Sequence, residues 1–502
     1  MIKLRALLIC TVFTGCSVLA IGQGGANRAK PMNIIFILSD DHRYDAMGFM
    51  NKIPGLQTPG MDRMAKEGAH LKNAFVSTAL CSPSRASILT GQYAHTHTVV
   101  DNDAPLPDNL TFFPQYLQKS GYQTAFLGKW HMGNTDDKPQ PGFDHWVSFQ
   151  GQGVYYNPTF NINGQRVKQP EGSYTTDLLT ENAIDWLNHR NKQKPFFVYL
   201  SHKGVHAEFK AAKRHAGKYA NLPIVCPPSM YLTATDSSKV YGEVTAPKGP
   251  VNYKDIPQWV RRQRYSWHGV DFMYHGDIKF NDFYRQYLET LLAVDESIQR
   301  VLDWVKEQGL EQNTMVVYMG DNGFSFGEHG LIDKRHAYEE SMRVPLLCWA
   351  PALVKPGTVV PQIIMNIDIA PTFLQLAGVN RPANMQGSSF ADLLRGNQTP
   401  WRDKVFYEYY WEASFPQTPT IFAIRTDRYK YIYNHGVWDI NELYDLQNDP
   451  YEMNNLIRDT SFRKTGMALK KELFGWLEET KGQQIPLKYP PGRNDHQFRN
   501  TY

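Results

Sequence analysis

Short apolar runs separated by amphipathic stretches dominate the hydrophobic pattern of this chain. The runs are rich in β-favouring residues and do not alternate, which is typical of parallel strands buried on both faces. Five stand out: Asn33–Ser39, Gln123–Gly128, Pro195–Ser201, Thr314–Gly320 and Val344–Ala350. Stretches of helical period lie between them, notably Asp177–His189 and Tyr284–Gln308. We therefore expect an α/β fold in which helices sandwich a large, mainly parallel or mixed sheet.

Two segments depart from this rhythm. Residues 204–280 are rich in Pro, Tyr, Trp and Lys, and an irregular insertion of that length is typically a substrate-facing loop. The other segment follows residue 398, where three short aromatic runs precede a helical period: Val405–Tyr410, Thr420–Arg425, Arg428–Tyr433 and then Gly466–Thr480. We predict a catalytic domain over 23–398 and a C-terminal subdomain over 399–502, built from a small antiparallel sheet and one helix.

The first 22 residues resemble a secretory signal peptide, with Lys3 and Arg5 ahead of a short apolar core. Phe13-Thr-Gly-Cys16 also resembles a bacterial lipobox, which would make Cys16 a lipidated N-terminus and the only link to a membrane. Cleavage near Gly22 is slightly favoured, because lipoboxes prefer Leu where Phe13 stands. Either route predicts export, to the periplasm or the medium, or as an outer-membrane lipoprotein.

Composition narrows the range of functions further. The 502 residues are 42% hydrophobic and 20% charged, which is ordinary for a globular protein. The net charge of +4 falls to +2 without Lys3 and Arg5, too little to suggest a nucleic-acid partner. Three cysteines would remain after cleavage: Cys81, Cys226 and Cys348. Whether Cys226 and Cys348 pair is left open.

Polar side chains follow four of the predicted strands. They are Asp40 and Asp41, Lys129 and His131, His202 with His206 shortly after, and Asp321 and Asn322. Ligands of open α/β sheets bind outside the carboxyl ends of the strands, so we expect these groups to share one edge. Three carboxylates and an amide oxygen suit Ca²⁺ or Mg²⁺ better than zinc.

Cys81 and Arg85 lie at the start of a further predicted helix. A nucleophile beside a guanidinium at a helix N-terminus suits an anionic ester. The alternative is a small buried cysteine in a turn. Lys334, in a Gly-rich loop, adds a cation that would meet the anion or the leaving oxygen, unless it is simply a surface lysine.

These motifs together resemble a known family. Cys81-Ser-Pro-Ser-Arg85 followed by Ala-Ser-Ile-Leu-Thr-Gly91 resembles the signature of the type I, formylglycine-dependent sulfatases of the alkaline-phosphatase-like superfamily. The family's other motifs follow its order: Ser39–Asp45, Gly128–Gly133, Ser201-His202, Gly320–Gly323 and Asp333-Lys334. Within the family, Ser87–Asn102 and Leu331–Arg335 are most similar to N-acetylglucosamine-6-sulfatases and bacterial polysaccharide sulfatases.

The resemblance implies a sulfuric ester hydrolase that releases inorganic sulfate. A formylglycine-generating or anaerobic sulfatase-maturating enzyme would oxidise Cys81 to 3-oxoalanine (formylglycine), whose gem-diol attacks sulfur. One Ca²⁺ would be held by Asp40, Asp41, Asp321, Asn322 and the modified Cys81. The remaining roles would be divided between Arg85 and Lys129 on the diol, His131 as base, and His202 and Lys334 on the sulfate and leaving oxygen.

The resemblance also implies a substrate class, a sulfated polysaccharide or oligosaccharide. Our hypothetical sugar-binding residues are Asp45, His95, His97, His206 and Arg335. Aromatic residues of the insertion are candidates for stacking on sugar rings: Trp259, Tyr265, Trp267 and His268. Two alternatives stay open, a phosphonate monoester or phosphodiester hydrolase of the same superfamily and a non-catalytic carbohydrate-binding relative.

Overall fold

The computed structural model describes residues 31–485, apart from 134–135, 226, 232–254 and 264–279. The predicted signal peptide and Cys16 lie outside the described residues, as do Cys226 and the stacking candidates Tyr265, Trp267 and His268. Within the described part of the chain, no helix has both the length and the apolarity needed to cross a membrane.

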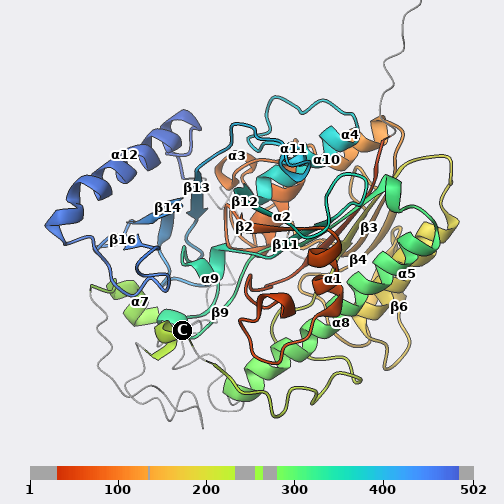
Figure 1. Ribbon diagram of the computed structural model, residues 1–502, viewed down its shortest axis with the longest axis horizontal. Helices are drawn as coiled ribbons and strands as arrows, with labels where there is room; N and C mark the ends of the chain where they lie inside the picture. Colours follow the sequence, from red (N-terminus) through yellow and green to blue (C-terminus); the bar gives the residue numbers. More distant parts are fainter. Residues whose placement is uncertain (1–30, 134–135, 226, 232–254, 264–279, 486–502) are drawn as a thin grey trace, which may run out of the picture. The chain divides into compact units, whose positions relative to one another are not determined.

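A ten-stranded mixed sheet forms the centre of the fold (Figure 1). Its order is β12-β2-β11-β8-β1-β7-β3-β4-β5-β6. The bounds are β1 Asn33–Ser39, β2 Ala69–Phe75, β3 Gln123–Lys129, β4 His145–Phe149, β5 Thr159–Ile162, β6 Gln165–Lys168, β7 Phe196–Ser201, β8 Thr314–Gly320, β11 Leu346–Trp349 and β12 Thr358–Met365. The core strands β8, β1, β7, β3 and β4 are parallel, whereas β11 runs antiparallel to both β8 and β2. The predicted α/β class is confirmed, and the sheet is mixed.

Helices cover both faces of this sheet. The bounds are α1 Pro59–Glu67, α2 Cys81–Thr90, α3 Ala94–His97, α4 Phe113–Lys119, α5 Thr175–His189, α7 Gln258–Gln263, α8 Phe280–Glu307, α9 Glu339–Met342, α10 Ile369–Leu376 and α11 Ala391–Leu394. Ile35 and Ile37 of β1 pack in one core with α1, α5 and α8, while Ile34, Phe36 and Leu38 pack in another with α2, α4 and α10. Burial of alternate residues on opposite faces explains why this strand is apolar from Ile34 to Leu38.

A second, four-stranded antiparallel sheet follows in the chain. It comprises β13 Lys404–Tyr409, β14 Thr420–Thr426, β15 Tyr429–His435 and β16 Glu442–Asp445, and α12 Arg463–Glu479 lies beside it (Figure 1). Trp476 of α12 stacks on Phe406 of β13 with ring centroids 4.6 Å apart. This confirms the predicted small sheet with one helix. A two-stranded ribbon, β9 Ser325–Phe326 with β10 Ile332–Asp333, belongs to the loop after β8.

One stacking candidate of the insertion is described. Trp259 of α7 is 5% exposed and belongs to the same hydrophobic core as α2 and α10. Its backbone N–H donates to Asp439 Oδ2 at 2.7 Å. The prediction that Trp259 stacks on a sugar is therefore wrong, because its ring is already packed inside the protein.

Candidate active site

Three carboxylates meet where β1 and β8 end. Ser39 pairs with Gly320 in the parallel register, so the residues that follow, Asp40 and Asp41 on one strand and Asp321 on the other, are neighbours. One carboxylate oxygen of each of the three aspartates lies within 4.8 Å of those of the other two. Burial, with the nearby carboxylates, raises the pKa of Asp41 to about 7 despite the ammonium of Lys334.

Two buried oxygens at this point have no hydrogen-bond partner among the described residues: Asp41 Oδ2 and Asn322 Oδ1. Unpaired buried oxygens are costly, and a hard divalent cation would satisfy both while relieving the repulsion between the carboxylates. The donor set therefore fits Ca²⁺, as the sequence predicted.

Three cations neutralise the same carboxylates. Arg85 Nη2 donates to Asp321 Oδ2 at 2.8 Å, and Lys334 Nζ lies 2.5 Å from Asp41 Oδ1. Lys129 pairs directly with Asp40. Burial acts to raise the pKa of Asp40, but the surrounding cations, Lys129 first, hold it well below its ordinary value. Each cation comes from a different element, so the tertiary fold assembles this network.

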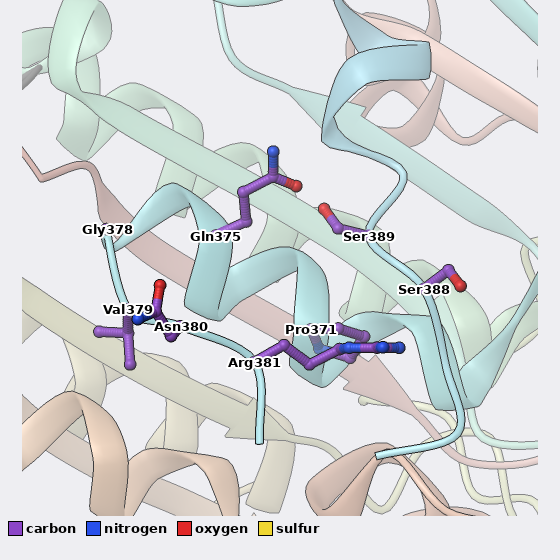
Figure 2. Close-up of a pocket in the computed structure, with 8 residues that line it drawn as sticks. All are labelled: Pro371, Gln375, Gly378, Val379, Asn380, Arg381, Ser388 and Ser389. Atoms are coloured by element: carbon purple, nitrogen blue, oxygen red, sulfur yellow. The ribbon is translucent and has the colours of Figure 1, made fainter. Parts of the chain in front are cut away.

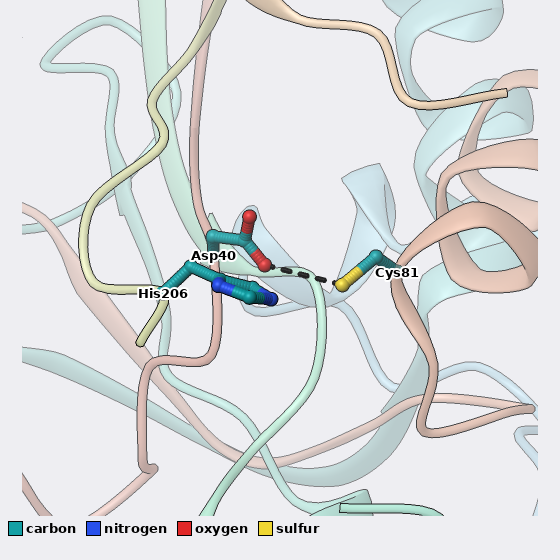
Figure 3. A group of neighbouring side chains, drawn as sticks. All are labelled: Asp40, Cys81 and His206. Carbon is teal, nitrogen blue, oxygen red and sulfur yellow. Dashed lines mark hydrogen bonds between the residues drawn. The ribbon is translucent and has the colours of Figure 1, made fainter. Parts of the chain in front are cut away.

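Cys81 is the first residue of α2 and is completely buried. Its thiol donates to Asp40 Oδ1 at 3.3 Å (Figure 3), and Lys334 Nζ lies 3.3 Å from the sulfur. Burial, with the charge on Asp40, raises the pKa of this thiol far above its ordinary value. The unmodified side chain is therefore a neutral thiol at pH 7, a poor nucleophile. Cys348 on β11 is also a free, buried thiol.

Lys129 and His131 reach the cluster from the end of β3. Arg85 Nη1 donates to the carbonyl of Lys129 at 2.7 Å, and Lys129 Nζ donates to Gln152 Oε1 at 2.5 Å. His131 Nδ1 lies 3.4 Å from Ser82 Oγ. Burial and the ammonium of Lys129 hold the pKa of His131 well below its ordinary value, so its imidazole is neutral.

The structure corrects the prediction for His202. This side chain points to α8, where its Nε2 lies 2.9 Å from Ser297 Oγ, and burial lowers its pKa to about 3. His206, which we had considered as a sugar-binding residue, lies instead with Asp40 and Cys81 (Figure 3). Its Nε2 is 3.9 Å from Asp41 Oδ2. Both histidines follow β7, and only the path of the loop decides which one reaches the cluster.

Three other sugar-binding candidates, Asp45, His95 and His97, contact other side chains of the protein. Asp45 forms a bidentate ion pair with Arg43, whose Nε and Nη2 donate to Oδ1 and Oδ2, each at 2.9 Å. His95 Nδ1 lies 2.8 Å from Glu408 Oε2, and its ring packs against Tyr93 and Trp476.

His97 is completely buried and uses both ring nitrogens. Its Nε2 lies 3.0 Å from Ser87 Oγ, and its Nδ1 accepts from the backbone N–H of Val99. The hypothesis that His97 contacts sugar is therefore wrong, because its hydrogen-bonding capacity is used inside the core.

Arg335, the last of the sugar-binding candidates, directly follows Lys334 in the chain. Its Nε donates to Glu412 Oε1 at 2.8 Å, and its guanidinium lies 3.9 Å above the ring of Phe415. Glu412 and Phe415 belong to the segment between β13 and β14, so the part of the chain around the second sheet supplies groups next to Arg335. Its role in sugar binding stays a prediction.

A separate cavity of about 470 Å³ lies at the end of α10 and carries none of the cluster's residues (Figure 2). It is lined by Pro371, Gln375, Gly378, Val379, Asn380, Arg381, Ser388 and Ser389.

Two residues of the cluster's surroundings, Gln152 and Lys203, are not among the site residues predicted from the sequence. The only signal for Lys203 was its place directly after His202, at the end of a predicted strand.

The sheet has parallel central strands, and carboxylates and cations surround Cys81 at the ends of those strands. This combination is typical of enzymes that hydrolyse anionic esters. Residues 32–379 match the family described as Sulfatase, and residues 327–479 match the C-terminal region of N-sulphoglucosamine sulphohydrolase. The chain belongs to the sulfatase family and is an enzyme that hydrolyses sulfate esters.

Several relatives are similar over most of their length. The N-acetylglucosamine-6-O-sulfatase of Bacteroides thetaiotaomicron is 36% identical over 495 residues, covering 90% of this chain and 87% of the relative. The human N-acetylglucosamine-6-sulfatase is 30% identical, covering 82% of this chain and 73% of the relative.

Two solved structures bear on the fold and the substrate. One, a protein in complex with its substrate D-glucosamine-2-N,6-O-disulfate, has a TM-score of 0.78 at 33% identity and covers 91% of this chain and 99% of its own. The phosphonate monoester hydrolase of Agrobacterium radiobacter, with a TM-score of 0.66 at 19% identity over 89% and 96% of the two chains, shares the fold.

Proposed function

We propose that this protein is an exported sulfatase that removes 6-O-sulfate from glucosamine units of sulfated polysaccharides or oligosaccharides. The observation that carries the proposal is the group around Cys81, where Asp40 Oδ1 and Lys334 Nζ each lie 3.3 Å from the sulfur. The 36% identity to an N-acetylglucosamine-6-O-sulfatase supports the sugar. The signal-like segment at residues 1–22 supports export to the periplasm or beyond.

Two groups complete this site in our proposal. Asp40, Asp41, Asp321 and Asn322, together with the modified Cys81, would hold Ca²⁺, which would supply positive charge for the sulfate oxygens. A maturating enzyme would convert Cys81 to formylglycine, which would replace an inert thiol by a hydrated aldehyde as nucleophile.

The chain's own residues then divide the remaining work. Arg85 and Lys129 orient residue 81 and the carboxylates around it. His131 is neutral because of its low pKa, so its free imidazole can accept a proton from the nucleophile side. Lys334 stays charged, since Asp41 and Cys81 raise its pKa well above the ordinary value although burial opposes this, and it binds the sulfate.

His206 takes the role that we had predicted for His202. Burial and the ammonium groups of Lys129 and Lys334 hold the pKa of His206 well below its ordinary value. A bound sulfate ester brings a negative charge beside the ring, which favours the imidazolium. His206 would therefore gain its proton with the substrate and pass it to the leaving sugar oxygen.

The substrate is tested with a panel of esters on protein co-produced with a maturating enzyme. We expect the highest kcat/KM on N-acetylglucosamine 6-sulfate and its N-sulfated analogue, by about tenfold or more over galactose 6-sulfate, since one hydrogen bond to a sugar hydroxyl contributes about that factor. The alternative, a phosphodiester or phosphonate hydrolase, predicts a higher kcat/KM on a phosphate diester than on the sulfate ester of the same phenol, and that result would refute the proposal.

The nucleophile is tested by Cys81→Ala, with Cys348→Ala as the matched buried-thiol control. We expect Cys81→Ala to abolish sulfate release with little change in thermal unfolding, because the side chain is small and the chemistry needs it. Cys348→Ala should keep its activity. Mass spectrometry of the peptide containing residue 81 checks for the aldehyde, and sulfate release by Cys81→Ala at the wild-type rate contradicts the assignment.

A further inference from the structure

Lys203 is a buried cation for which the described part of the chain supplies no carboxylate partner. Lys203 is only 5% exposed, and among the described residues no hydrogen bond or ion pair involves its ammonium. The contact recorded for it is with an aromatic face, where Nζ lies 4.7 Å from the ring centroid of Tyr155. By contrast, Lys129, Lys334 and Arg85 each pair with an aspartate of the cluster.

Burying an ammonium is costly unless an anion or a set of acceptors compensates it. A cation–π contact offsets part of that cost but supplies no negative charge. Among the described residues, the ammonium of Lys203 therefore has no compensating negative charge, as is expected of a cation that binds an anionic ligand.

The turn that carries Lys203 is bonded to the end of β1. The backbone N–H of Asp40 donates to the carbonyl of Gly204 at 2.9 Å, and that of Val205 donates to the carbonyl of Asp40 at 2.7 Å. Within the turn, the N–H of His206 donates to the carbonyl of Lys203 at 3.0 Å. Lys203 and His206 are thus held in one unit, fixed to a predicted metal ligand.

Tyr155, in the segment between β4 and β5, contacts both Lys203 and His206. Its hydroxyl donates to the carbonyl of His206 at 2.6 Å, while its ring supports the ammonium of Lys203. Tyr155 therefore helps to position both Lys203 and His206. The imidazole of His206 lies beside Asp40 and Cys81 (Figure 3).

The charges that act on Lys203 belong to the reacting centre. Burial and the ammonium of Lys129 lower the pKa of Lys203 to about 8, against the opposing effect of Asp40, Asp41 and Cys81. With a pKa of about 8, the ammonium remains largely protonated at pH 7.

We propose that Lys203 binds the sulfuryl group that the enzyme hydrolyses, as a further cation of the catalytic site. This inference rests on the proposed function. A sulfate ester presents three oxygens with a shared negative charge, and an ammonium offers three donors to meet them. The group that Lys203 recognises is the scissile sulfate, since Lys203 shares a turn with His206, whose ring lies with Asp40 and Cys81, and that turn is hydrogen-bonded to Asp40.

The test compares three variants of the mature, calcium-loaded enzyme. Lys203→Met keeps an unbranched apolar side chain over Tyr155 but removes the charge, and Lys203→Arg keeps the charge. Lys210→Met removes an exposed lysine seven positions along the same segment and serves as the control. The probe is inorganic sulfate, whose binding is measured by the shift of the thermal unfolding midpoint with concentration.

We expect Lys203→Met to raise the Kd for sulfate about tenfold or more, the factor set by one charge-assisted hydrogen bond. kcat/KM on a 6-sulfated glucosamine should fall by a similar factor, while Lys203→Arg recovers part of both and Lys210→Met changes neither. Unchanged sulfate affinity in Lys203→Met would overturn the inference. So would a loss confined to substrates that carry a second sulfate, because it would place the ammonium on another group of the sugar.

Failure of the proposed function is distinguishable from failure of this inference. Sulfate binding needs no turnover, so it reports on Lys203 even if the sugar panel identifies a different substrate. If Lys203→Met fails to fold, Lys203→Gln supplies the neutral variant, and its sulfate Kd decides the same question.

Discussion

Asp41 shows most clearly how single residues define this site. Its Oδ1 lies 2.5 Å from Lys334 Nζ, whereas its Oδ2 is buried with no hydrogen-bond partner among the described residues. A carboxylate satisfied on one oxygen only, with two further aspartates within reach, is arranged for a cation on the other. The same logic applies to Asn322, whose Nδ2 donates to Asp41 while its Oδ1 has no hydrogen-bond partner in the described part of the chain.

Asp321→Asn tests that arrangement. We expect calcium binding to weaken about tenfold or more, with loss of activity, because the charge of the ligands sets affinity for a hard cation. Calcium content after dialysis and the midpoint of thermal unfolding with and without calcium are the measurements. The control is Asp295→Asn, a buried carboxylate that accepts from the backbone of Gly60 and Met61. Equal calcium content in Asp321→Asn and the wild type would show that Asp321 is not a ligand.

His97 predicts a pH effect on stability. Burial lowers its pKa to about 3, against an ordinary value of 6.5. Between those values the unfolded chain binds a proton that the folded protein does not, so the free energy of unfolding decreases as the pH falls below 6.5. The slope for one such group is ~1.4 kcal/mol per pH unit.

The His97→Gln variant should therefore lose stability less steeply between pH 7 and pH 5, by about one proton's worth of slope. Urea denaturation at pH 7, 6 and 5 measures it. His189→Gln changes an exposed histidine and should leave the slope as in the wild type. Parallel slopes for His97→Gln and the wild type would mean that the native state binds this proton too.

At the scale of elements, the strand ends and the loops after them aim the side chains. Lys334 sits between Asp333 and Arg335, which hold positive φ values of 89° and 80°. Such conformations are unfavourable for residues with a side chain and persist only where the surroundings enforce them. The bonds of Arg335 to Glu412 and Asp333 supply that constraint, so Lys334 points at Asp41 and Cys81.

Gly128 serves the same purpose at the end of β3. Its φ is 123°, and a Cβ placed there would lie 1.7 Å from the carbonyl oxygen of Ser201 on β7. Gly128→Ala should destabilise the protein by more than about 2 kcal/mol, since backbone must shift, and should displace Lys129 and His131. Gly475→Ala in α12, where a Cβ meets nothing within 4 Å, should stabilise by about 0.5–1 kcal/mol. Thermal unfolding and sulfate release measure both, and wild-type behaviour of Gly128→Ala would contradict the close approach.

At the scale of the whole molecule, buried ion pairs join the C-terminal sheet to the main domain. Lys430 of β15 is completely buried, with Nζ 2.9 Å from Glu339 Oε1 of α9 and 2.7 Å from Glu452 Oε1. Glu339 begins α9, five residues after Lys334 in the chain, so this contact of Lys430 is made close in sequence to a residue of the cluster around Cys81. We expect the two parts to unfold together.

Lys430→Met should lower the free energy of unfolding by about 3 kcal/mol, because it leaves the buried carboxylate of Glu452 without its cation, whereas Glu339 keeps Arg425. Lys464→Met, an exposed position at the start of α12, should change it by less than about 0.5 kcal/mol. Denaturation followed by both tryptophan fluorescence and activity checks this. An early transition of the C-terminal part with activity retained would show that the two parts are independent.

Much of the site was predictable from sequence because it lies directly at strand ends. Asp40, Asp41, Asp321 and Asn322 follow apolar runs whose class is unmistakable, and parallel pairing of β1 with β8 then brings them together. The direction of β11 was not predictable, since an apolar run buried on both faces looks the same in either orientation. The choice between His202 and His206 was not predictable either, because both follow β7 and the loop's hydrogen bonds to Asp40 decide.

The sequence by itself determined the α/β class, the family and the chemistry of the cluster, since apolar periodicity and adjacent motif residues are local properties of the chain. Tertiary structure alone decided which side chains meet. It placed His97 and Trp259 in the core, brought His206 to Cys81, and buried Lys203 with no carboxylate partner among the residues described. These outcomes depend on loop paths and long-range packing, where residues distant in sequence compete for the same space and the same hydrogen bonds.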